Sequence, residues 1–118
     1  MAKPEQIQSD ELRPIMQDAH RALREQDPNT VVHRCADAFL LLAKRVPRVT
    51  QLPPGVRMHP FPRLGAMLRL REGEPPEIEF EREEFSFAEA LTYYEYVLTT
   101  ILAVEKRAAG TQAGATAP

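Results

Sequence analysis

The sequence predicts a small, mainly α-helical domain that also contains a short β-hairpin. Two neighbouring amphipathic segments and a long apolar segment near the C-terminus have helical spacing, and two short alternating segments flank a turn. The chain has 118 residues, of which 43% are hydrophobic and 27% charged, the size and composition of one globular domain. We therefore expect an α+β architecture in which helices dominate. An all-α four-helix bundle is the alternative.

The first two helices are expected at residues 11–26 and 28–45. The apolar stripe of the first consists of Leu12, Ile15, Met16, Ala19 and Leu23. Pro14 fits because it falls in the opening turn, where backbone N–H groups lack helical partners. Asp27 and Pro28 predict a restart, since an N-cap acceptor precedes a proline at the first helical position. The second helix is expected to bury Val32, Cys35, Ala36, Phe39, Leu42 and Ala43. With almost no linker between them, the two helices should form an antiparallel hairpin.

Residues 47–63 form a proline-rich segment, with five prolines at positions 47, 53, 54, 60 and 62. Such a segment is neither a helix nor a central strand, because proline lacks the backbone N–H that both require. We expect an extended, partly polyproline-like crossover. Structureless loops of this length are uncommon in compact domains, so the segment is a candidate location for function.

Residues 67–71 and 77–81 alternate between apolar and charged side chains, and Gly and Pro residues lie between them. This pattern predicts an antiparallel β-hairpin. The register that matches both faces pairs Leu70 with Ile78, Leu68 with Phe80, Arg69 with Glu79 and Arg71 with Glu77. A short helix over residues 64–71 is the alternative.

The C-terminal helix is expected over residues 86–108. Ser86 and Glu89 form a capping-box pattern, in which each side chain accepts a hydrogen bond from the other residue's backbone N–H. The apolar face consists of Phe87, Leu91, Tyr94, Leu98, Ile101 and Leu102, widened by Tyr93, Val97 and Val104. A helix with so broad an apolar face is either central to the domain or shared with a second copy. We therefore expect a protein partner or a homodimer, with candidate interface residues Tyr93, Tyr94, Val97 and Ile101.

The two ends of the chain are small, polar and aperiodic, which predicts disorder at residues 1–8 and 109–118 around a single domain at residues 9–108. The longest apolar run, at residues 38–43, is far shorter than the ~20 residues of a membrane span. No apolar signal segment follows the N-terminus, and the one cysteine cannot form an internal disulfide. These features predict a cytoplasmic chain without membrane attachment.

No pattern predicts a catalytic, cofactor-binding or metal site. His33, Cys35 and Asp37 are close in sequence, but residues two apart on a helix point about 200° away from each other. Cys35 belongs to the buried stripe, where a thiol is unreactive, whereas His33 and Asp37 are expected to pair on the surface. Metal-binding, P-loop and nucleophile-elbow motifs do not occur in the sequence. We therefore expect a non-enzymatic chain that holds no cofactor.

Charge is distributed unevenly along the chain, although the net charge is only −2. Residues 38–71 contain no acidic residue, whereas residues 72–89 contain eight glutamates and one basic residue, Arg82. One interpretation is that the two blocks face each other. The other is that Arg45, Arg48, Arg57 and Arg63, with His59 and Phe61 among them, bind the phosphates of a nucleic acid.

Residues 22–44 resemble the first helical pair of HEPN domains, in which a helix ends in a short acidic turn and an alanine-rich helix follows. A tetratricopeptide-like hairpin would have a similar pattern. The resemblance implies a four- or five-helix bundle, commonly dimeric, and some HEPN domains are ribonucleases. Catalytic members carry Arg, four to six residues and then His on a later helix. Here only Arg13 and His20, both on the first helix, have that spacing. The resemblance therefore implies a non-catalytic member.

The leading functional prediction is a non-enzymatic protein-interaction or regulatory domain. A nucleic-acid-binding module that uses the basic segment 45–71 is the second, and a relative of HEPN-type ribonucleases is the third.

Overall fold

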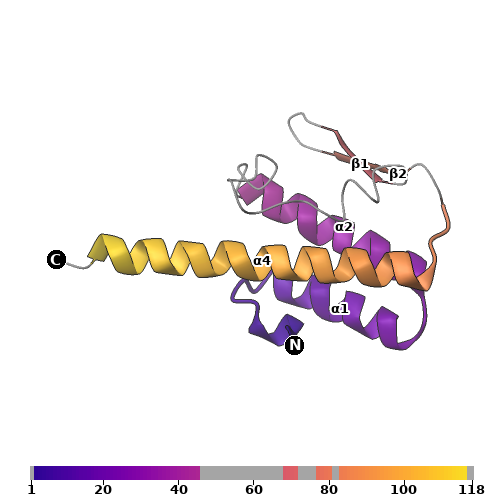
Figure 1. Cartoon of the computed structure of the whole chain (residues 1–118), viewed down its shortest axis with the longest axis horizontal. Helices are drawn as coiled ribbons and strands as arrows, with labels where there is room; N and C mark the ends of the chain where they lie inside the picture. Colours follow the sequence, from indigo (N-terminus) through magenta and orange to yellow (C-terminus); the bar gives the residue numbers. More distant parts are fainter. Residues whose placement is uncertain (1, 46–67, 72–76, 81–82, 117–118) are drawn as a thin grey trace.

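The computed structural model describes residues 2–45, 68–71, 77–80 and 83–116. Its elements are η1 (Pro4–Gln6), α1 (Leu12–Arg24), α2 (Pro28–Arg45), β1 (Leu68–Arg71), β2 (Glu77–Phe80) and α4 (Phe87–Thr116). The fold is mainly α: α1 and α2 form a hairpin, and α4 lies along it (Figure 1). The predicted helical hairpin and long C-terminal helix are therefore confirmed. The described residues contain three α-helices rather than the four of the alternative bundle, and the proline-rich segment 47–63 lies outside them.

The turn between α1 and α2 is closed by hydrogen bonds within the turn itself. Asp27 donates its backbone N–H to the carbonyl of Ala22 at 2.9 Å, and Gln26 donates to Leu23 at 3.1 Å, which are the two bonds of a Schellman C-cap. Gln26 adopts the left-handed φ of 57° that this cap requires. The Asp27 carboxylate then accepts hydrogen bonds from the backbone N–H of Thr30 at 3.3 Å and from its hydroxyl at 2.6 Å. Because both helix ends satisfy their backbone groups locally, a longer linker is unnecessary.

The hydrophobic core lies between the three helices, and α2 contacts both of the others extensively. All six residues expected to be buried on α2 are buried. On α4 the buried residues are Ala90, Tyr93, Tyr94, Tyr96, Val97, Leu98, Thr100 and Ile101. The expected capping box also forms at the start of α4. The Ser86 N–H donates to Glu89 Oε1 at 2.9 Å, and the Glu89 N–H donates to Ser86 Oγ at 3.1 Å. Helical periodicity thus identifies the buried face of α2, whereas on α4 two residues of the expected apolar face, Phe87 and Leu91, are exposed.

The two strands pair antiparallel in a two-stranded sheet. Their register sets Leu68 against Phe80, Arg69 against Glu79, Leu70 against Ile78 and Arg71 against Glu77, the same pairs that the alternating pattern gives. Ile78 and Phe80 are partly buried against the helical core. The Phe80 ring lies 4.7 Å from the ring of His33 and 6.0 Å from that of Phe85, measured between ring centroids. This face of β2 therefore lies against α2 (Figure 1).

The expectation of disorder at residues 1–8 is wrong for the described residues 2–8. Pro4 and Ile7 are buried, and Ile7 is only 1% exposed. The backbone N–H groups of Gln8 and Ser9 donate to the two carboxylate oxygens of Glu105 on α4, at 2.8 and 2.9 Å. We call this contact the N-terminal anchor. The sequence did not predict this contact because a single buried aliphatic residue, Ile7, produces no periodic pattern. Its other determinant, Glu105, lies far away in the sequence.

Helix α4 is longer than expected, since it continues beyond Ala108 to Thr116, into the segment expected to be disordered. Three of the eight residues in this extension are alanines, which favour a helix, whereas Gly110 and Gly114 disfavour it. The C-terminal part of α4 extends past the ends of α1 and α2 (Figure 1). Within the described residues, no helix is both long enough and apolar enough to span a membrane.

Candidate functional site

The predicted interface residues lie inside the chain's own core. Tyr93, Val97 and Ile101 are each 0% exposed, and Tyr94 is 6% exposed. The prediction that they form a surface for a second copy is therefore wrong for this fold. These side chains pack against α2 and α1 instead, because the broad apolar face of α4 covers one side of the two-helix hairpin.

Tyr94 connects α4 to α1 through a polar contact. Its hydroxyl lies 3.1 Å from Nδ1 of His20, and the two ring centroids are 6.0 Å apart. Burial raises the pKa of Tyr94 to about 12. The contact thus joins α4 to α1 through a neutral phenol.

The described residues have two exposed large apolar side chains, Phe87 and Leu91, with exposed fractions of 45% and 36%. Both lie in the first turns of α4, four residues apart and so on one side of the helix. The same apolar stripe continues into Tyr94 and Leu98, which are buried. We call Phe87 and Leu91 the apolar α4 patch. It is the uncovered end of a stripe whose remainder is covered by the chain's own hairpin.

The apolar α4 patch has exposed acidic residues beside it. Glu83 and Glu84 directly precede α4, and Glu95 follows Leu91 by one helical turn. All three are exposed, and no hydrogen bond or ion pair joins any of them to another described residue. Residues 83–105 contain five glutamates and no lysine or arginine. We call Glu83, Glu84 and Glu95 the acidic rim.

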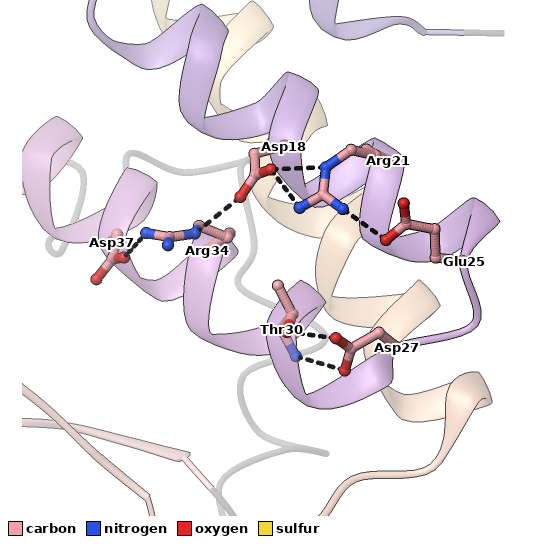
Figure 2. A network of polar contacts seen from close by, with 7 residues as sticks. All are labelled: Asp18, Arg21, Glu25, Asp27, Thr30, Arg34 and Asp37. Carbon is pink, nitrogen blue, oxygen red and sulfur yellow. Dashed lines mark hydrogen bonds and ion pairs between the residues drawn. The ribbon is translucent and has the colours of Figure 1, made fainter.

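On the outer face of the α1–α2 hairpin, by contrast, acidic side chains are paired with basic ones in a network (Figure 2). Asp18 on α1 accepts from Arg21 at 2.6 Å and from Arg34 on α2 at 2.9 Å. Arg21 also reaches Glu25 at 2.5 Å, and Arg34 reaches Asp37 at 3.3 Å. The hydrogen bond from Arg21 is the main cause of the lowered pKa of Asp18. Exposed pairs of this kind contribute about 0–1 kcal/mol each, so the network supports the hairpin modestly.

The four candidate phosphate-binding arginines are not brought together in the described part of the chain. Arg45 lies at the end of α2, where its Nη1 donates to Ser9 Oγ at 2.8 Å and its other terminal nitrogen forms an ion pair with Glu11. It thus connects α2 to the start of α1. Arg48, Arg57 and Arg63 lie outside the described residues.

The apparent metal-binding cluster separates as helical geometry requires. Cys35 is 0% exposed, and burial raises the pKa of its thiol. His33 and Asp37 are exposed, but the expected pair between them is replaced by other contacts: Asp37 accepts from Arg34, and His33 lies against Phe80. In the part of the chain that the structure describes, no group of three His, Cys, Asp or Glu side chains could hold a metal ion.

Arg13 and His20, whose spacing matches the HEPN pattern, both have structural contacts on α1. Arg13 donates through Nη1 to the carbonyl of Ile7 at 3.0 Å and forms an ion pair with Asp10. His20 contacts Tyr94. None of the protein-family models, curated proteins or solved structures compared with this chain matches it. The described residues therefore define a mainly α domain in which one end of the apolar stripe of α4 is exposed.

Sequence reasoning placed Phe87 and Leu91 on the apolar face but did not identify them as exposed. The sequence does not separate these two from the buried residues of the same stripe, because which part of the stripe the hairpin covers depends on the tertiary arrangement, which periodicity does not encode.

Proposed function

We propose that this chain is a non-enzymatic protein-interaction domain whose contact surface is the apolar α4 patch. The observation that carries the proposal is the exposure of Phe87 and Leu91 on one side of a helix whose neighbouring apolar residues are buried. Exposed apolar residues scattered singly are ordinary, but two large ones on adjacent turns form a local contact surface.

Hydrogen bonds hold the start of α4 in place, which favours binding. The capping box of Ser86 and Glu89 fixes the first turn of α4. Just before it, the backbone N–H of Phe85 donates to Asn29 Oδ1 on α2 at 2.9 Å, and the Phe85 ring is buried. A pre-organised surface loses little conformational entropy when a partner binds.

The double substitution Phe87→Ser and Leu91→Ser tests the proposal. Because Phe87 and Leu91 are only 45% and 36% exposed, the free energy of unfolding should fall by about 1–3 kcal/mol, and circular dichroism checks that the variant remains folded. Thr92→Ser and Thr99→Ser, at exposed positions of the same helix, form the matched control. Proteins that co-purify with the tagged wild-type chain and the control, quantified by mass spectrometry, should fall at least tenfold with the double variant. Equal recovery by all three chains would contradict the proposal.

A second copy of this chain is one protein that could occupy the patch. Light scattering at tens of micromolar distinguishes this case, since a homodimer through the patch would become a monomer in the Phe87→Ser, Leu91→Ser variant. A wild-type monomer would assign the patch to a different protein.

Nucleic-acid binding by the basic segment 45–71 is the second candidate function, favoured by the absence of acidic residues at positions 38–71. Its test is the triple substitution of Arg48, Arg57 and Arg63 by Gln, with Arg45 retained because it contacts Ser9 and Glu11. If this function holds, mobility shifts of mixed DNA and RNA at low salt should disappear in the triple variant. Absence of a shift with the wild-type chain at micromolar concentration would eliminate it.

A further inference from the structure

We infer that the partner segment recognised by the apolar α4 patch is a short amphipathic helix whose polar positions carry lysine and arginine. This inference rests on the proposed function and specifies its partner class. The juxtaposition that carries it is an exposed Phe87–Leu91 pair flanked in the sequence by three exposed glutamates, none of which forms an ion pair with another described residue.

The contrast between two faces of the molecule supports the charge of the partner. On the α1–α2 face, Asp18, Glu25 and Asp37 are each paired with an arginine of the same chain (Figure 2). No such pairing occurs for the acidic rim within the described residues. Glu83 and Glu84 are adjacent in the sequence and repel each other, so a basic partner relieves that repulsion as well as adding attraction. An acidic partner would add to the repulsion and is disfavoured.

The spacing supports a helical partner. Phe87, Leu91 and Glu95 follow one another at intervals of four residues, so the line they form is about 12 Å long at 1.5 Å per residue. Two turns of an α-helix cover about 11 Å and present apolar side chains at positions i and i+4. Helix-on-helix recognition uses such anchors, with charged residues at the edge of the contact setting the choice of partner.

The acidic rim should act mainly on the rate of association and on partner choice. Its three charges are exposed, and salt screens exposed charges over a distance of about 8–10 Å at physiological ionic strength. Charges at an interface edge therefore raise the association rate at low salt, while the apolar contact determines how long the complex lasts. Substitutions in the acidic rim should therefore change mainly the association rate and its salt dependence, and substitutions in the apolar α4 patch mainly the dissociation rate.

The test uses fluorescence anisotropy with the full chain and two designed 18-residue probe peptides. Both have leucines along one helical stripe; one has lysine at the remaining positions and the other has glutamate. We expect the lysine peptide to bind at least tenfold more tightly than the glutamate peptide. The triple variant Glu83→Gln, Glu84→Gln, Glu95→Gln should bind the lysine peptide three- to tenfold more weakly, with a smaller dependence on salt. The variant Phe87→Ser, Leu91→Ser should bind neither peptide.

The control removes the same number of negative charges from exposed positions outside α4, through Asp10→Asn, Glu25→Gln and Asp37→Asn. If this variant loses as much affinity as the rim variant, the effect is one of net charge and the inference is wrong. Equal binding of the two peptides by the wild-type chain would also overturn it. Binding that appears only when Arg48, Arg57 and Arg63 are replaced by Gln would show that the chain's own basic segment occupies the patch, which would overturn the inference too.

Failure of this inference is distinguishable from failure of the proposed function. If the rim variant retains every co-purifying protein while the Phe87→Ser, Leu91→Ser variant loses them, the apolar α4 patch is an interaction surface for a partner of different charge. If both variants retain them, the proposed function fails as well.

Discussion

Replacing Glu105 by Ala should destabilise the protein by removing the N-terminal anchor. The carboxylate accepts one hydrogen bond from the N–H of Gln8 at 2.8 Å and one from that of Ser9 at 2.9 Å. Without it, the backbone at residues 8 and 9 loses both partners, and the segment that carries the buried Ile7 is released from α4.

The magnitude follows from the two hydrogen bonds. Bonds to a charged acceptor contribute about 1.5–3 kcal/mol each when the groups are shielded from water. The Gln8 N–H lies in an exposed contact and regains most of its energy from water, whereas the Ser9 contact is partly buried. We therefore expect a loss of about 2 kcal/mol in the free energy of unfolding, and a Tm lower by about 8 °C. Glu105→Gln should lose about half as much, because its amide oxygen still accepts a hydrogen bond.

Urea denaturation followed by circular dichroism measures this loss, with Glu95→Ala as the matched control. That substitution makes the same change in helix propensity at an exposed position of the same helix. Hydrogen exchange supplies the local readout, since the amides of Gln8 and Ser9 should exchange faster in the Glu105→Ala variant. If the two alanine variants differ by less than 0.5 kcal/mol, or if exchange at these amides is unchanged, the reasoning about the N-terminal anchor is refuted.

Three further predictions concern the α1–α2 turn, the surface network and the tyrosines. Gln26→Gly should raise the free energy of unfolding by about 0.5–1 kcal/mol, because Gln26 has a positive φ that glycine adopts without strain; a lower urea midpoint would contradict this. The pKa of Asp18 is lowered in the folded chain, mainly by the hydrogen bond from Arg21, so its contribution is present above pH 3.8 and lost as the pH falls below it. The difference in stability between the wild type and Asp18→Asn should therefore shrink in acid, and a difference that stays constant down to pH 2 would be inconsistent with this pairing. The pKa of Tyr94 is raised to about 12, so the stability that its neutral form provides is present below pH 10 and lost as the pH rises through 12. Tyr94→Phe should lose less stability than the wild type over this interval, and phenolate absorbance that appears well below pH 10 in the native chain would argue against the burial effect.

The sequence predicts the helices because their determinants are local. The N-cap at Asp27, the capping box at Ser86 and the period of the apolar residues specify where α2 and α4 begin and which faces they bury. The pattern also gives the strand register, since alternation on two short segments leaves one pairing that matches both faces.

The contacts that were missed connect residues far apart in the sequence. In the sequence, nothing distinguishes Glu105 from other glutamates of the helix, and only the fold places its carboxylate beside the N-terminal segment. Tyr93 and Ile101 were assigned to an intermolecular interface because periodicity shows that a face is apolar but not what covers it. The exposure of Phe87 depends likewise on which part of α4 the hairpin covers, which is a property of the assembled domain.

The N-terminal anchor also has a consequence for the order in which the molecule is made. Its two hydrogen bonds join residues 97 and 96 positions apart in the chain. Synthesis proceeds from the N-terminus, and contacts between distant residues form more slowly than local ones. The α1–α2 hairpin can close on its own, whereas Gln8 and Ser9 have no carboxylate to bind until residue 105 has emerged from the ribosome. A chain interrupted before that point lacks the carboxylate that both amides bind, so closure of the N-terminal anchor requires α4 to have been synthesised at least as far as Glu105.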